Sequence, residues 1–129
     1  MKVAVILGGT SFEREVSLKT GKAVLEACKN NNYEVEAVMI DKNYKKYLPI
    51  LRNVDVVFNA LHGTMGEDGT IQKCLEENNI NFTGSDSVSS ALCMNKMECK
   101  KILRKNGFLT PSWIEFKEHL KTNEVSLPC

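Results

Sequence analysis

The feature that most constrains the fold is the apolar run over residues 2–7, in which polar and apolar side chains do not alternate. A strand with this pattern is covered on both faces, as strands of a parallel sheet are. Two glycines follow the run, and a stripe at helical spacing then extends from Val16 through Thr20 to Cys28. The sequence therefore begins with a predicted strand, tight turn and helix, which is the opening unit of a parallel α/β sheet.

The rest of the chain continues this alternation. The predicted strands cover residues 34–40, 55–59, 80–83 and 112–116, and the predicted helices cover residues 44–52, 70–78 and 87–106. Pro49 is expected to break the first of these helices, and Gly107 to cap the last one. The pattern predicts an α/β fold with a doubly wound, mostly parallel sheet flanked by helices.

Length and charge narrow the function classes. The chain has 129 residues, enough for one ordinary domain. A net charge of +1 gives no reason to expect nucleic acid or an anionic membrane as a partner. The sequence has no apolar run long enough to span a membrane and no secretory leader, so a cytoplasmic location is expected. Five cysteines without a CxxC pair predict neither a disulfide framework nor a metal site.

The glycines indicate where a ligand would bind. Six of the eight fall just after predicted strands. In open α/β sheets ligands bind beyond the carboxyl ends of the strands, where glycine allows the backbone to come close to them. These six are Gly8, Gly9, Gly63, Gly66, Gly69 and Gly84.

Two ionisable side chains stand out at this edge. Glu13 lies in the first turn of the predicted helix, where the helix dipole favours a carboxylate whatever the function. It could also receive the ammonium group of a ligand. His62 ends a buried strand, where it is either a structural histidine or a donor to a ligand carboxylate. No second histidine or cysteine stands at ligand spacing from His62, which argues against a metal site.

Other polar residues have ordinary structural interpretations. Glu67 and Asp68 precede a predicted helix and are expected to cap it. Lys96 belongs to a basic cluster typical of a solvated helix face. Asp41 ends the second strand, where a dinucleotide-binding fold would hold a ribose. The turn after the first strand does not have the GxGxxG pattern of such folds, however, which argues against a domain that binds a nicotinamide dinucleotide.

Three motifs occur in order along the chain. They are GGTSFEREVS at residues 8–17, ALHG with GEDGT over residues 60–70, and TGS with SAL and MNK over residues 83–96. Together they resemble the amino-terminal part of the D-alanine–D-alanine ligases, a family of the ATP-grasp superfamily, over residues 2–116. The resemblance implies a Rossmann-like pre-ATP-grasp domain.

The resemblance also implies an activity and site residues. The enzyme would use ATP and magnesium to join two D-alanines for peptidoglycan, through an acyl phosphate. Glu13 would hold the ammonium of the first D-alanine, Val16 would line that subsite, and His62 would face its carboxylate. Lys96 would reach an ATP phosphate, and the full enzyme would be a cytoplasmic homodimer. Asn95 and Phe12 depart from the common pattern of the family without touching these roles.

We expect residues 1–116 to form the substrate-binding domain and residues 117–129 to begin the connection to an ATP-grasp domain. The 129-residue chain alone is therefore expected to have no catalytic turnover. Two alternatives remain at this stage. One is a ligase that makes D-alanyl-D-lactate or D-alanyl-D-serine, and the other is a nonenzymatic module for amino-acid binding or dimerisation.

Overall fold

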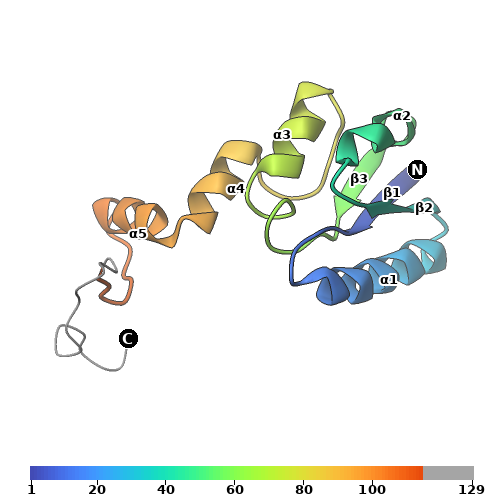
Figure 1. Ribbon diagram of the computed structural model, residues 1–129. Helices are drawn as coiled ribbons and strands as arrows, with labels where there is room; N and C mark the ends of the chain where they lie inside the picture. The colour runs from blue at the N-terminus through green and yellow to red at the C-terminus, as the bar shows by residue number, and fades with distance from the viewer. Residues whose placement is uncertain (115–129) are drawn as a thin grey trace. The chain divides into compact units, whose positions relative to one another are not determined.

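The structure is a computed structural model that describes residues 1–114, and it divides into two compact units (Figure 1). The first unit, Met1–Met94, contains three strands and most of the helices. The second begins at Asn95 and contains α5 (Lys96–Lys105). In order along the first unit the elements are β1 (Lys2–Gly8), α1 (Arg14–Asn30), β2 (Glu34–Ile40), the 3-10 helix η1 (Tyr44–Tyr47), α2 (Leu48–Leu51), β3 (Val56–Asn59), α3 (Thr70–Glu77) and α4 (Ser87–Met94).

The three strands form a parallel sheet in the order β2-β1-β3. The central strand β1 has buried side chains on both faces, as its unbroken apolar run predicts. Ala4 and Ile6 face one cluster of buried residues, and Val3, Val5 and Leu7 face the other. Because β1 is covered on both sides, the sheet must carry helices on both faces.

Helices cover the two faces of the sheet as predicted. Leu18, Val24 and Leu25 of α1 pack on one face. Leu51 of α2 and Leu75 of α3 pack on the other. The helix α1 thus covers one face of the sheet, and α2 and α3 cover the other (Figure 1). The doubly wound, parallel α/β architecture is therefore confirmed.

The expected strand at residues 80–83 is reduced to one parallel bridge, between Val57 and Phe82. The Val57 amide donates to the Asn81 carbonyl at 2.8 Å, and the Thr83 amide donates to the Val57 carbonyl at 3.0 Å. The next amide along, that of Asn59, donates to the Thr83 hydroxyl at 3.2 Å instead of a backbone oxygen. The ladder ends there because a side chain has replaced the next backbone acceptor.

The helix expected over residues 87–106 is interrupted at Asn95. Asn95 has φ −84° and ψ 86°, and its side chain accepts a hydrogen bond from the Glu98 amide. Helical periodicity continues through this position, but an Asn that caps its own backbone competes with helix continuation. Gly107 adopts the left-handed conformation predicted for a cap, with φ +79°.

The remaining predictions concern Pro49 and the end of the chain. The helix expected over residues 44–52 is divided next to Pro49 into η1 and α2, and Pro49 lies in the first turn of α2, where proline is tolerated. Residues 112–114 form no strand, and the rest of the predicted strand at 112–116 and the tail at 117–129 lie outside the described residues. Across residues 1–114, no helix combines the length and the apolar character needed to cross a membrane.

Candidate functional site

The loops that follow β1 and β3 meet at the carboxyl edge of the sheet. The buried Ser17 on α1 joins the two strand ends, since its hydroxyl accepts from the Gly8 amide at 2.9 Å and donates to the Ala60 carbonyl at 2.7 Å. One side chain thereby satisfies two buried backbone groups that would otherwise lack partners. The position of α1 is fixed against both strands.

Ser11 connects the same two loops further out. Its hydroxyl donates to the His62 carbonyl at 2.7 Å and accepts from the Glu13 amide at 3.1 Å. Gly63 lies so close to this loop that a Cβ atom there would collide with Oε2 of Glu13. The structure therefore brings the predicted site residues Glu13 and His62, which lie far apart in the sequence, to neighbouring positions at this edge of the sheet.

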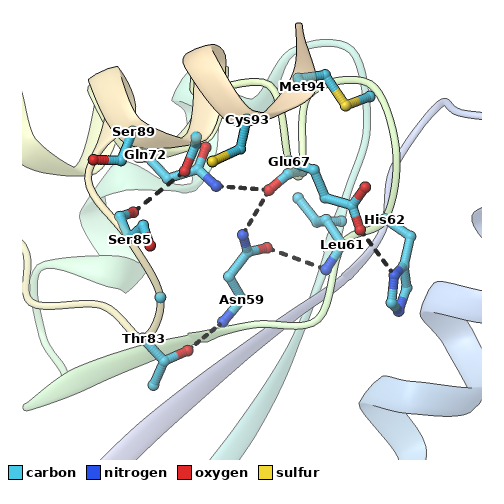
Figure 2. A pocket seen from close by; sticks show the side chains of 13 residues that line it. Asn59, Leu61, His62, Glu67, Gln72, Thr83, Ser85, Ser89, Cys93 and Met94 are labelled. Carbon is cyan, nitrogen blue, oxygen red and sulfur yellow. Dashed lines mark hydrogen bonds and ion pairs between the residues drawn. The ribbon is translucent and has the colours of Figure 1, made fainter. Parts of the chain in front are cut away.

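The imidazole of His62 has a hydrogen-bond partner at each nitrogen. Its Nε2 lies 3.0 Å from the Thr20 hydroxyl of α1, and its Nδ1 lies 3.2 Å from Oε1 of Glu67 (Figure 2). The ring is partly buried, with 29% of its side-chain surface exposed, and Glu67 is 47% exposed. The ring is thus held in one orientation by residues of this chain alone.

The loop between β3 and α3 is packed around the carbonyl of Gly66. That oxygen accepts hydrogen bonds from Nδ2 of Asn59 at 2.8 Å and from Nε2 of Gln72 at 2.7 Å (Figure 2). A Cβ on Gly66 would lie 2.5 Å from Cβ of Leu61 and 2.9 Å from the His62 amide nitrogen. Glycine is required here by close packing within the loop itself.

Asp68 stabilises the same loop and the start of α3. Its carboxylate accepts from the Met65 amide at 2.9 Å and from the Thr70 amide at 3.0 Å. Partial burial by itself would raise the pKa of Asp68, but the hydrogen bonds from Met65 and Thr70 outweigh it and hold this pKa below its usual value. Gly69, not Asp68, occupies the N-cap position of α3, and Asp68 accepts from the first amide of the helix from one residue earlier. Glu67 contacts His62 instead of the helix.

A cavity of about 480 Å³ lies beside His62, between the β3–α3 loop and α4. Hydroxyl and amide groups line it, and Cys93 and Met94 contribute its sulfur atoms (Figure 2). Gln72 is 5% exposed, and its Oε1 is the one buried side-chain oxygen or nitrogen of residues 1–114 without a hydrogen-bond partner. A second hollow of about 300 Å³ is lined by Glu13, Phe12 and Gly63.

Two other predicted site residues occupy different surroundings. Val16 is 49% exposed in the first turn of α1, one helical turn before Thr20, so it shares a face with the residue that contacts His62. Lys96 is exposed at the start of α5 in the second unit. Its role toward ATP therefore stays a prediction.

The ribose-binding alternative finds no support at Asp41. Its carboxylate pairs with Lys46 and accepts from the Asn43 amide at 2.8 Å and the Tyr47 hydroxyl at 3.2 Å. The hydrogen bond from Lys46 lowers the pKa of Asp41. In the described part of the chain, no three His, Cys, Asp or Glu side chains gather as a group that could hold a metal ion.

Sequence reasoning missed the two partners of His62. Thr20 belongs to the predicted apolar stripe of α1, and its position one turn after Val16 is the signal that it reaches the sheet edge. Position alone predicts that Glu67 caps a helix, although the glycines around it indicate a loop that folds back toward His62. Both contacts join residues far apart in the sequence or across a tight loop, which spacing alone does not reveal.

Comparison with known proteins decides the family. A family model described as the D-ala D-ala ligase N-terminus matches residues 2–51 and 44–85, which is more than half of the chain. The chain belongs to this family. Its domain is the D-alanine–D-alanine ligase N-terminal domain, as the three motifs predicted.

Individual relatives agree with this family. The D-alanine–D-alanine ligase of Thermotoga maritima is 41% identical over 129 residues, and that of Carboxydothermus hydrogenoformans is 46% identical over 116 residues. The first match covers 100% of this chain and 42% of the relative, and the second covers 90% and 37%. The chain thus spans well under half the length of these curated relatives.

Solved structures of this family have the same fold. The Bacillus anthracis D-alanine–D-alanine ligase superposes with a TM-score of 0.83 at 39% identity, covering 96% of this chain and 41% of that one. A structure of the B. anthracis enzyme complexed with ATP gives a TM-score of 0.77 at 42% identity, with the same coverage of both chains.

Proposed function

We propose that this N-terminal domain supplies the first D-alanine subsite of an ATP-dependent D-alanine–D-alanine ligase. The observation that supports the proposal is that Ser11 joins the backbones of Glu13 and His62, with Gly63 packed against the Glu13 carboxylate. An amino acid carries an ammonium and a carboxylate on one carbon. A carboxylate and an imidazole presented at the same edge of the sheet are complementary to that pair of charges.

The domain positions a substrate, and positioning accounts for much of the catalysis of joining two amino acids. Glu13 would receive the ammonium, His62 would face the carboxylate, and the half-exposed Val16 would line the wall next to the Cα methyl. Bound groups would lie at the carboxyl edge of the sheet, as expected for this architecture.

ATP and magnesium belong to the proposal through the family. A relative binds ATP in its solved structure, and the exposed ammonium of Lys96 suits a phosphate partner. Residues 1–114 provide no cluster that would hold magnesium, so we assign no metal ligand to them. The cytoplasmic location, the homodimer and the domain boundary at residue 116 remain parts of the proposal.

Substrate kinetics test the subsite. In a full-length ligase that contains this chain, Glu13→Gln should raise the KM for the first D-alanine by roughly 10- to 100-fold, because a charge-assisted hydrogen bond is lost. His62→Ala should act in the same direction, and the KM for ATP should change much less. Glu15→Gln is the matched control, since Glu15 occupies the same helical turn with a side chain 79% exposed.

Unchanged D-alanine kinetics in both variants would exclude this subsite. A second assay concerns the 129-residue chain by itself. The family's relatives are more than twice as long as this chain, so we expect no phosphate release from ATP and D-alanine above a heat-denatured control. Release above that control would show that residues outside this chain are not needed.

A further inference from the structure

The cavity between the β3–α3 loop and α4 contains a buried polar atom that the chain itself does not satisfy. Gln72 lines this cavity and is 5% exposed. In the part of the chain that the structure describes, its Oε1 is the one buried side-chain oxygen or nitrogen without a hydrogen-bond partner. Buried polar atoms of folded proteins are nearly always hydrogen-bonded, so this oxygen indicates a group that binds in the cavity and donates to it.

The orientation of the Gln72 amide is fixed by the loop that it supports. Its Nε2 donates to the Gly66 carbonyl at 2.7 Å. With the amide reversed, two carbonyl oxygens would face each other at that distance and repel. Figure 2 shows the amide on the α4 side of Gly66, toward Ser89 and Cys93. An amide oxygen only accepts hydrogen bonds, so the partner of Oε1 must be a donor.

The charge of the cavity wall selects the kind of donor. Glu67 is its one acidic residue, and none of the described residues in the wall is a lysine or an arginine. Both ring nitrogens of His62 already have partners within the chain. Because Oε1 of Glu67 is the oxygen that faces His62, its Oε2 stays open to a cation in the cavity. This wall favours an ammonium group over an anion.

The remaining polar groups of the wall suit a ligand that also carries a hydroxyl. The Thr83 hydroxyl oxygen accepts from the Asn59 amide at 3.2 Å, so its own hydrogen can be donated to a ligand. Ser89 and Ser90 add further hydroxyls from α4. The volume of about 480 Å³ lies within the range of small-molecule sites, roughly 300–1,000 Å³.

We propose that this cavity binds a small amino alcohol, whose primary ammonium donates to Oε1 of Gln72 and is balanced in charge by Glu67. The hydroxyl of the ligand bonds to the hydroxyls of the wall. No covalent bond forms or breaks. This site is separate from the hollow lined by Glu13, and it does not depend on whether that hollow holds D-alanine.

NMR of the 129-residue chain tests the site with ethanolamine as the probe, at constant ionic strength. We expect saturable shift changes at the side-chain amide of Gln72 and at the backbone amides of Gly66 and Ser89. The dissociation constant should lie in the millimolar range, as for other very small ligands. The absence of a saturable shift at Gln72 would overturn the proposal.

Two related compounds separate the contributions of charge and hydrogen bonding. Choline carries the same positive charge and hydroxyl but has no N–H group, and ethylene glycol has the hydroxyls without the charge. Each should bind more weakly than ethanolamine by roughly tenfold or more. If choline binds as tightly as ethanolamine, Gln72 does not receive an N–H donor and the proposal is overturned.

Variants locate the probe within the domain. Gln72→Met keeps the length of the side chain but removes Oε1, so ethanolamine binding should weaken by roughly tenfold or more. Glu67→Gln should weaken it severalfold, because the balancing charge is lost. Glu15→Gln is the matched control for loss of a surface carboxylate and should leave binding unchanged.

Three outcomes would contradict this assignment. Wild-type binding by Gln72→Met or by Glu67→Gln would show that the cavity does not hold the ammonium. Loss of binding in Glu13→Gln would place the ammonium in the other hollow. If Gln72→Met does not fold, Glu67→Gln and the choline comparison still decide the question.

The same titration of a full-length ligase that contains this chain tests whether the cavity stays open in the larger protein. Ethanolamine should again shift the Gln72 side-chain signal. Loss of this shift would mean that the rest of the ligase fills the cavity, which would overturn the site. The D-alanine kinetics of Glu13→Gln report separately on the first D-alanine subsite, so either proposal can fail without the other.

Discussion

The two loops at the carboxyl edge of the sheet are built differently. In the β3–α3 loop Leu61, Gly63, Met65, Gly66 and Gly69 are buried, and backbone and side-chain hydrogen bonds hold the loop internally. In the β1–α1 loop Thr10, Phe12 and Glu13 are exposed.

This difference separates two tasks at one site. The β3–α3 loop fixes His62 with partners that belong to the domain itself, so the ring is oriented without a ligand. The β1–α1 loop presents the carboxylate of Glu13 toward the open hollow and depends on Ser11 for its attachment. Substitutions in the β3–α3 loop should therefore lower the free energy of unfolding, and substitutions in the β1–α1 loop should lower it much less.

Gly66→Ala should produce the largest loss. Its new Cβ would lie 2.5 Å from Cβ of Leu61 and 2.7 Å from the Leu61 carbonyl carbon, and backbone atoms cannot move aside cheaply. We expect the free energy of unfolding to fall by about 3 kcal/mol or more. Urea denaturation followed by circular dichroism measures it.

Gly9→Ala is the matched change in the exposed loop. Gly9 has φ +78°, and an added Cβ would meet only the Cδ2 atom of Leu61, at 3.3 Å. The left-handed backbone should cost about 1–2 kcal/mol. If Gly9→Ala is as damaging as Gly66→Ala, the two loops do not differ in the way described.

Ser17→Ala should cost about 2 kcal/mol, because it leaves the buried Gly8 amide and Ala60 carbonyl without their partner. Ser17 bonds to both loops, since Gly8 and Ala60 lie where the β1–α1 and β3–α3 loops begin. Thermal unfolding of this variant should be compared with that of Ser90→Ala, whose hydroxyl makes only a 3.4 Å exposed contact. Equal stabilities of the two variants would contradict the bridging role.

The sequence was sufficient to predict the layers of this fold and the position of its ligand edge. The unbroken apolar character of β1 requires cover on both faces, and the residues of α1 and α3 that provide it recur at helical spacing. Glu13 and His62 could be placed at one edge because parallel strands end on the same side.

The predictions of a fourth strand and of one long helix were wrong because each depends on a single side-chain hydrogen bond. The Thr83 hydroxyl ends the expected fourth strand, and Asn95 interrupts the expected long helix. The periodicity of apolar residues does not indicate whether a backbone amide will donate to a backbone oxygen or to a side-chain oxygen. The contact between Thr20 and His62 spans 42 positions, so only the folded chain reveals it.

Ser11→Ala should cost about 1 kcal/mol, since its part-buried hydroxyl bonds to the His62 carbonyl, and its local effect should be larger than its global one. Hydrogen exchange at the Glu13 amide should accelerate, because that amide loses its acceptor at 3.1 Å. Exchange within the β3–α3 loop should change little. Thr10→Ala, one position earlier on the exposed loop, should change neither quantity. Faster exchange throughout the β3–α3 loop would show that the two loops unfold together.

The smallest expected effect is the pH dependence carried by Asp68. Because hydrogen bonds from Met65 and Thr70 hold its pKa below the usual value, Asp68 stabilises the fold at pH values above the unfolded pKa of about 3.9. That contribution is lost as the pH falls through the lower, folded-state pKa. Asp68→Asn should be slightly less stable than wild type at neutral pH, by under about 1 kcal/mol after solvent screening.

The two proteins should become equally stable in acid, because a protonated Asp68 and an Asn both lack the negative charge that the two amides favour. Urea midpoints at neutral pH and at about pH 2.5, below the usual carboxyl range, measure the closing gap. A gap of the same size at both pH values would mean that the charge of Asp68 does not stabilise the β3–α3 loop. In that case the order of this loop would come from its packing and from the hydrogen bonds to Gly66, which do not titrate.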